Sequence, residues 1–207
     1  MKKKDSSREK RRQARTEKRK KARTKAATKK KAAKSVDNLP PLPDRRAMEG
    51  AMFEMFRSHS QTPVDQAQDI MYQAWDAAEP KRRVKLACKA LEISEDCADA
   101  YVLLAEETAT SLPEAIDLYR KGVEAGERAI GREMFEEGIG HFWGILKTRP
   151  YMRARCGLAQ CLWGTGQQME AIEHYQEMLR LNPNDNQGIR YLLAACLLEL
   201  DRDDDLA

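Results

Sequence analysis

The apolar residues of this chain follow the spacing of amphipathic helices from Met48 toward the C-terminus. Apolar side chains at i, i+3, i+4 and i+7 lie on one helical face and mark the face that packs. The first such stretch follows Asp44, a residue type that favours a helix start. Its apolar positions are Met48, Ala51, Met52, Met55 and Phe56. The pattern predicts an N-terminal amphipathic helix over residues 45–62, which either caps the first helical repeat or provides a Met-rich docking surface.

The pattern that follows repeats at a spacing of 34 residues. The helical set beginning at Ala67 recurs from Tyr101, and the set beginning at Arg155 recurs from Ile189. Repeats that hold two helices stack so that each unit buries its apolar face against its neighbours. We therefore predict an all-α fold, a solenoid of helix-turn-helix repeats over residues 63–207. Its units are expected at residues 64–97, 98–131 (irregular), 152–185 and 186–207 (partial).

One irregularity interrupts the repeat. Tyr101 and Arg155 are 54 residues apart, which is one period plus 20. Six of the eleven glycines lie between Gly122 and Gly144, and each glycine inside a helix costs about 1 kcal/mol relative to alanine. We expect an irregular insertion near residues 124–150, with a short helix around His141–Lys147, that serves either as a spacer or as a functional element.

The best unit, residues 152–185, resembles the tetratricopeptide repeat (TPR). The positions that match the signature of that family are Leu158, Ala159, Gly166, Ala171, Tyr175 and Pro183. Two further segments, at 148–159 and 181–191, are similar to those of bacterial TPR proteins related to the suppressor of tumorigenicity seven family. The resemblance implies a groove lined by the first helix of each unit, and it implies no catalytic activity.

The resemblance also implies which side chains line that groove. Carried onto this sequence, the groove positions that we select as partner-binding residues are Glu106, Arg153, Gln160, Trp163 and Arg190. Arg153 and Arg190 are suited to a carboxylate of a partner peptide, because a guanidinium binds carboxylate through two parallel hydrogen bonds. The Lys and Asn set of the TPR domains that bind chaperone tails is absent, so we do not expect a chaperone tail. The alternative is that these charges are simply solvated.

Charge divides the chain into two parts. Residues 1–35 hold 18 Lys and Arg against 3 Asp and Glu, whereas the rest holds 19 against 30. We predict a disordered basic tail over residues 1–36 and a stiff proline-rich linker over 37–44. The tail residues expected to contact a polyanion are Lys10, Arg11, Arg12, Lys18, Arg19, Lys20, Lys21, Lys29, Lys30 and Lys31. Nucleic acid, ribosomal RNA, anionic lipid or an import receptor fits such a tail, and a merely solubilising role is the alternative.

Candidate chemistry is sparse. The five cysteines form no C-x-x-C pair, the three histidines lie at no metal-ligand spacing, and no phosphate-loop or nucleophile-elbow motif occurs. We therefore expect no cofactor, no metal and no enzymatic activity. No apolar run is long enough for a membrane span and no secretory signal is evident, so we expect a cytoplasmic protein, or a nuclear one in a eukaryote.

Together these features predict a non-enzymatic scaffold that binds a partner polypeptide in its groove while the basic tail contacts a polyanion. One alternative is a nucleic-acid- or ribosome-associated protein that binds mainly through the tail. Another is an enzyme whose catalytic region lies beyond residue 207. The sequence identifies neither the partner nor the oligomeric state.

Overall fold

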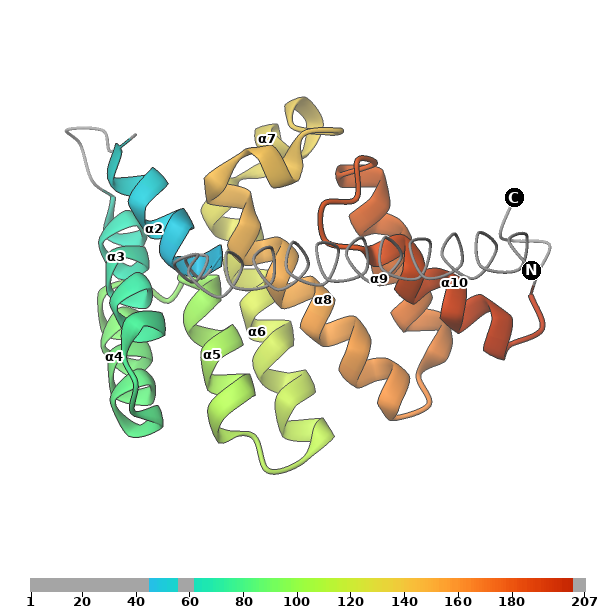
Figure 1. Cartoon of the computed structure of the whole chain (residues 1–207), viewed down its shortest axis with the longest axis horizontal. Coiled ribbons are helices and arrows are strands. Elements are labelled where there is room, and N and C mark those ends of the chain that lie inside the picture. The colour runs from blue at the N-terminus through green and yellow to red at the C-terminus, as the bar shows by residue number, and fades with distance from the viewer. Residues whose placement is uncertain (1–44, 56–61, 203–207) are drawn as a thin grey trace, which may run out of the picture. The chain divides into compact units, whose positions relative to one another are not determined.

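The computed structural model describes residues 45–55 and 62–202, and every regular element in these residues is a helix. This confirms the predicted all-α class. The predicted tail over 1–36, the linker over 37–44 and Phe56 lie outside the described residues. The elements in chain order (Figure 1) are α2 (Arg45–Met55), α3 (Pro63–Asp76), α4 (Pro80–Ile93), α5 (Ala98–Thr108), α6 (Leu112–Ile130), α7 (Arg132–Glu137), the 3-10 turns η1 (Phe142–Gly144) and η2 (Leu146–Thr148), α8 (Arg149–Gly164), α9 (Gln168–Leu181) and α10 (Ile189–Glu199).

The helices pack as successive pairs. The pairs α3–α4, α5–α6 and α8–α9 are each joined by a short turn, and α10 packs against α9. Neighbouring pairs contact one another through α4 with α5 and through α6 with α8, as the row of hairpins in Figure 1 shows. The first helices of the pairs also touch directly, α3 with α5 and α5 with α8. We call the side formed by α3, α5, α8 and α10 the first-helix surface.

Local sequence signals set the helix ends. Thr62 and Asp65 form a reciprocal capping box before α3, and the side chain of Ser111 accepts a hydrogen bond from the backbone N–H of Glu114. Such caps satisfy backbone N–H groups that have no partner within the helix. Gly166, with φ of 82°, makes the turn between α8 and α9, where a residue without a Cβ meets no steric penalty.

The core has two parts of different composition. One cluster joins α3, α4 and α5 and consists mostly of alanine, with Ile70, Met71 and Leu103 as its large members. The other joins α5, α6, α8, α9 and α10 around larger side chains, including Tyr151 and Leu162. At its centre Gly157 of α8 lies directly against the Tyr119 ring of α6. This close approach leaves no room for a side chain at position 157.

The segment where we expected an insertion is packed into the larger cluster. α6 continues as a regular helix to Ile130, so its glycines at 122 and 126 are helical. Beyond α7, the ring of Phe142 is fully buried and lies 5.2 Å from that of Phe135, which is 5.1 Å from that of Tyr151. Gly126 faces Tyr151, where a Cβ would come within 2.8 Å of the tyrosine Cβ. The glycines of this helix therefore serve close packing.

α2 turns a different face inward from the one that its apolar pattern predicts. The side chains of Met48, Met52 and Met55 are 50%, 39% and 79% exposed, whereas Glu49 is only 4% exposed. The physical reason is charge, because Glu49 meets two arginines of α8. The expectation that the methionine face packs on the first repeat is therefore wrong.

Candidate functional site

α2 occupies the N-terminal part of the first-helix surface, formed by α3, α5 and the start of α8, which we call the covered part. This helix contacts α3 and reaches α5 and α8 through charged side chains. Gly50 lies over the ring of Tyr72, where a Cβ would be 3.2 Å from Cγ of the ring. A small residue at position 50 thus allows the backbone of α2 to lie close to α3.

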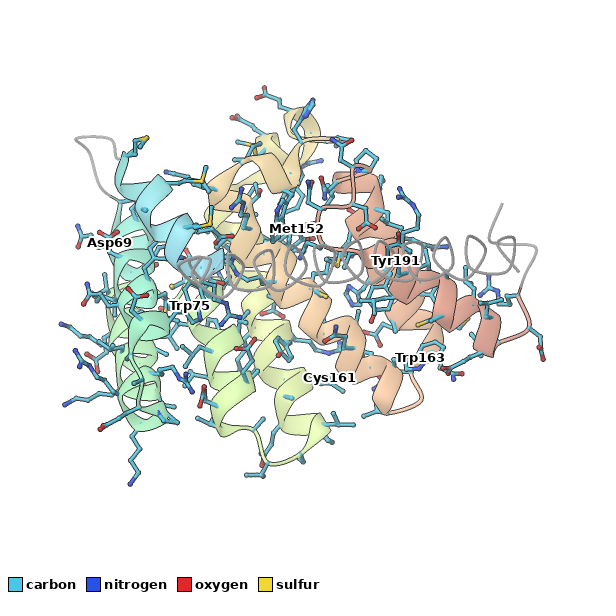
Figure 2. All side chains as sticks on the ribbon, viewed as in Figure 1. Asp69, Trp75, Met152, Cys161, Trp163 and Tyr191 are labelled. Carbon is cyan, nitrogen blue, oxygen red and sulfur yellow. The ribbon has the colours of Figure 1, made fainter. Side chains whose placement is uncertain are left out.

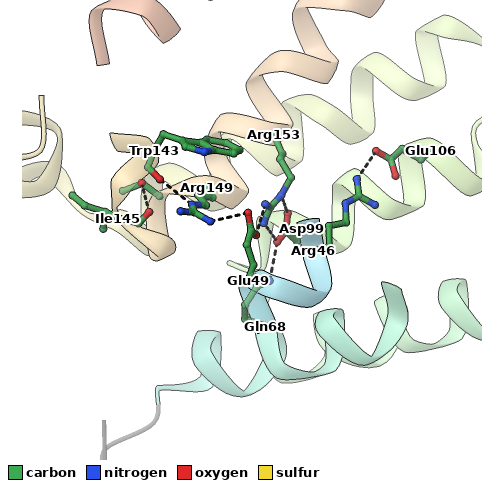
Figure 3. A network of polar contacts seen from close by, with 10 residues as sticks. Arg46, Glu49, Gln68, Asp99, Glu106, Trp143, Ile145, Arg149 and Arg153 are labelled. Carbon is green, nitrogen blue, oxygen red and sulfur yellow. Dashed lines mark hydrogen bonds and ion pairs between the residues drawn. The ribbon is translucent and has the colours of Figure 1, made fainter. Parts of the chain in front are cut away.

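Two arginines of α8 hold the carboxylate of Glu49 (Figure 3). Arg153 donates from Nη1 to Oε2 of Glu49 at 2.7 Å, and Arg149 donates from Nη1 to Oε1 at 3.0 Å. Each carboxylate oxygen therefore has its own cationic donor. Because the Glu49 side chain is 5% exposed and those of the arginines 11% and 15%, little water competes for these bonds.

Arg153 is held in place from its other side. Its Nε donates to Oδ1 of Asp99 at 2.8 Å and its Nη2 to Oδ2 at 2.5 Å. Asp99 is fully buried, and Nε2 of Gln68 donates to it at 2.8 Å. Burial alone would lower the pKa of Arg153, but the charge and hydrogen bonds of Asp99, aided by Glu49, raise it overall. Arg153 thus stays charged in the interior.

Arg149 is anchored by the segment before α8. Its Nε donates to the carbonyl oxygen of Trp143 at 2.8 Å, and its guanidinium lies 5.2 Å from the centre of the Trp143 ring. Arg149 is the first residue of α8, directly after η2. The interrupted segment before α8 therefore orients one of the two arginines.

Trp75 of α3 provides an aromatic wall beside this pair. The guanidinium of Arg46 lies 4.8 Å from the ring centre and that of Arg153 lies 5.1 Å from it, within the range of cation–π attraction. Arg46 also donates from Nη2 to Oε1 of Glu106 at 3.2 Å. α2 therefore touches the surface through one basic and one acidic side chain, three residues apart.

The groove positions chosen from the sequence divide between two environments. Glu106 pairs with Arg46, and Arg153 has Asp99 and Glu49 as partners, so both are engaged within the chain. Arg153, which we expected to bind a carboxylate of a partner peptide, is thus part of an intramolecular network. The physical reason is that Asp99, which occupies the equivalent repeat position on the neighbouring first helix, lies opposite it.

The other three positions lie beyond α2, on the C-terminal part of the first-helix surface, formed by the end of α8 and by α10, which we call the open part. Gln160 is exposed, Trp163 is half-buried, and Arg190 is exposed with its Nη2 donating to the carbonyl of Pro183 at 3.0 Å. Figure 2 labels Trp163 toward the end of α8 and Tyr191 on α10, away from α2. Tyr191 is 82% exposed. This part of the surface therefore exposes aromatic and amide groups.

Several contributors were not found from the sequence. Glu49 and Arg149 complete the network from outside the groove positions, whereas Gln68 and Trp75 lie at groove positions of the first unit, residues 64–97, that we did not select. The available signals were the groove positions of that first unit and the opposite charges of Asp99 and Arg153 at equivalent positions of adjacent first helices. All ten tail residues proposed for polyanion binding lie outside the described residues.

Nucleophilic and metal-binding groups do not gather. Burial raises the pKa of the Cys97 thiol to about 12 and that of Cys156 to about 11, so both stay protonated at neutral pH. Burial, and then the charges of Arg155 and Arg120, lower the pKa of His174 to about 4. Within residues 45–55 and 62–202, no cluster of His, Cys, Asp or Glu could hold a metal ion.

A cavity of about 230 Å³ is lined by residues of α3, α6 and η2 and by the start of α5 and α8. Its lining includes Asp65 and Asp96. Lys147 lies 3.2 Å from Asp65, and Arg128 lies 2.7 Å from Asp96. The carboxylates at its edge are therefore paired within the chain.

Stacked helix pairs that carry an ion-paired helix on one side define a helical-repeat protein of the α-solenoid class. The chain belongs to the ST7 protein family, whose family model matches residues 52–200, more than half of its length. In the part of the chain that the structure describes, no helix is long and apolar enough to cross a membrane.

Animal relatives support the family assignment. Suppressor of tumorigenicity 7 protein-like is 47% identical in Gallus gallus and 32% in Bos taurus, over 117 residues that cover 55% of this chain and 21% of each relative. Protein ST7 homolog of Drosophila melanogaster is 30% identical over 121 residues, 56% of this chain and 22% of the relative. The chain thus spans about a fifth of the relatives' length.

These matches correct one interpretation of the sequence. The attribution to bacterial TPR proteins is wrong, because the matching family model is that of the ST7 protein and these relatives come from animals. The 34-residue spacing reflects paired helices, and paired helices of that length are not specific to one family. The part of the resemblance that named the suppressor of tumorigenicity seven family agrees with the match.

Proposed function

We propose that this protein is a non-enzymatic scaffold that binds a partner polypeptide along its first-helix surface. One observation carries the proposal: a helical segment, α2, already lies across three successive first helices through side-chain contacts. A surface that accepts one helix from its own chain has the size and chemistry to accept a polypeptide where it stays open. The open positions are Gln160, Trp163 and Tyr191.

The chemistry of the open part suits polypeptide recognition. An aromatic side chain that is partly exposed offers a large contact area, and tryptophan and tyrosine are enriched where binding energy concentrates. Gln160 lies one helical turn before Trp163 on α8 and offers both a hydrogen-bond donor and an acceptor.

A site-specific photo-crosslinker tests this function. Placed at Gln160 in cells that produce the protein, it is expected to trap discrete protein adducts that disappear when Trp163 is replaced by alanine. The same crosslinker at Glu173, an exposed residue of the second helix α9, is the control and should not trap them. Identical adducts from both positions, or none from Gln160, would refute the proposal.

The basic tail supports a second activity, contact with a polyanion. Its 18 basic residues against 3 acidic ones within residues 1–35 are expected to bind RNA or DNA through counterion release, with steep salt dependence and little sequence preference. Binding titrations from low to high salt should show weak affinity that vanishes for residues 44–207, which form a compact unit of their own. Tight, sequence-selective binding by that shorter chain would favour the nucleic-acid alternative instead.

A further inference from the structure

We propose that the covered part of the first-helix surface is a binding site for a partner helix with the pattern Arg-x-x-Glu-small, and that α2 is its displaceable internal occupant. The proposal deepens the proposed function by naming the chemistry of one class of partner. It rests on how α2 is held, on how complete the site is without α2, and on the charge that α2 balances.

The contacts of α2 resemble those of a bound peptide more than those of a core helix. It inserts Glu49 and Arg46, while Met48, Met52 and Met55 on its apolar side are 50%, 39% and 79% exposed. A helix that belongs to a hydrophobic core shows the opposite arrangement, with its apolar stripe inward. Of the α2 side chains whose burial is described, the buried one is therefore charged, and the three methionines contribute little to the packing.

The receiving site is built without α2. Arg153 is fixed by two hydrogen bonds to Asp99, which Gln68 in turn supports. Arg149 is fixed by the carbonyl of Trp143 and by its ring. Each arginine contacts Glu49 through Nη1. The other nitrogens, Nε of Arg149 and Nε and Nη2 of Arg153, make the bonds that fix the side chain. When α2 leaves, both guanidinium groups keep their anchors and present Nη1 to a new carboxylate.

Charge complementarity specifies the occupant. Arg149 and Arg153 carry two positive charges and Asp99 carries one negative charge, so the buried network has an excess of one positive charge without Glu49. Leaving that charge unpaired is costly in a site with little water. The occupant must therefore supply a carboxylate at the position that Glu49 now fills.

The remaining contacts complete the pattern. Three residues before the glutamate, a basic group reaches Glu106 and stacks on Trp75, as Arg46 does. Directly after it, a small residue lies against Tyr72, as Gly50 does. The three positions fall on one helical face because residues three or four apart are neighbours on a helix.

A peptide-binding experiment with the full chain tests the site. The probe is a fluorescein-labelled, end-capped peptide with the sequence of residues 45–55, RRAMEGAMFEM. Glu49→Gln in the chain should weaken its own α2 and increase peptide affinity about tenfold, because occupancy by α2 reduces the fraction of competent sites. Asp117→Asn, the same chemical change at an exposed position of α6, should leave the affinity at the wild-type value.

Two further variants make the outcome specific. A peptide that carries Glu49→Gln should bind the Glu49→Gln chain about tenfold more weakly than the wild-type peptide, since two charge-assisted hydrogen bonds are lost. Arg149→Gln in that chain should remove binding. If the Glu49→Gln chain does not melt cooperatively, Arg46→Ala releases the other contact of α2 and should also raise peptide affinity.

Equal affinities for the wild-type and Glu49→Gln peptides would overturn the proposal. So would peptide affinities of the Glu49→Gln and Arg46→Ala chains that stay at the wild-type value. A dimer that the free peptide dissociates would also overturn it, because α2 of a second copy would then be the occupant. These measurements use purified chain and peptide, whereas crosslinking at Gln160 reports on the open part, so either proposal can fail alone.

Discussion

The two parts of the first-helix surface use their polar groups in opposite ways. Around α3, α5 and the start of α8, charges pair with one another and with α2, and the side chain of Asp99 is fully buried. Toward the end of α8 and along α10, Gln160 and Arg190 face solvent beside half-buried Trp163. The difference shows that the adjacent helix decides the role of a charged groove residue. Where that helix carries an opposite charge, the residue is paired within the chain, and where it does not, the residue faces solvent.

The largest effect is expected from removing the buried acid of the covered part. Asp99→Ala leaves Arg153 without its principal partner in a site with little water, and such a loss costs about 3–5 kcal/mol of unfolding free energy. Urea unfolding followed by circular dichroism measures it. Asp117→Ala, which removes an exposed acid from α6, is the matched control and should change little. A cost below that of an ordinary surface substitution would mean that Asp99 does not support the covered part.

The packing shared by both parts gives the next largest effect. In Gly157→Ala the new Cβ would collide with the Tyr119 ring and push α8 away from α6, at a cost of about 1–3 kcal/mol. Gly144→Ala is the control, because a Cβ there meets no atom within 4 Å. Thermal melts of both variants provide the comparison. Equal melting temperatures would show that α6 and α8 are not closely packed at position 157.

The amino-acid pattern predicted the fold better than the site. Helical periodicity is local, so it indicated the paired helices and the small residues between them, such as Ala159 and Ala171, without knowledge of the fold. Burial of Glu49 depends on two arginines about 100 residues away, and no local pattern carries that information. The methionine spacing of α2 even favoured the wrong face.

The segment before α8 shows the same limit. Its glycines predicted an irregular connection, but not that Trp143 would orient Arg149 through a carbonyl group and an aromatic ring. Such contacts depend on the backbone path of η1 and η2. Periodicity does not encode that path.

An acid-sensitive group lies on α9, the second helix that packs behind the open part. Because the pKa of His174 is lowered by burial to about 4, the folded chain resists its protonation, whereas the unfolded chain takes up the proton near pH 6.5. The contribution of neutral His174 to the unfolding free energy is therefore fully present above about pH 6.5 and is lost as the pH falls toward 4. At pH 5.5 the loss should be about 1 kcal/mol after allowance for the partial exposure of His174. His174→Gln should remove this share of the loss between pH 7.5 and pH 5.5, whereas His141→Gln, at an exposed position, should retain it.

The smallest effect on stability is expected in the open part itself, and this contrast separates the two parts most sharply. Arg190→Ala removes an exposed side chain whose guanidinium meets one backbone carbonyl, so the unfolding free energy should change by no more than about 0.5 kcal/mol. Urea unfolding would measure that change, and the crosslinking yield at Gln160 would measure partner contact in the same variant. If Arg190 serves binding, its replacement should lower the crosslinking yield while the unfolding free energy stays constant. If Arg190→Ala instead destabilises the chain as much as Asp99→Ala, the open part is built for folding as the covered part is, and the distinction between them disappears.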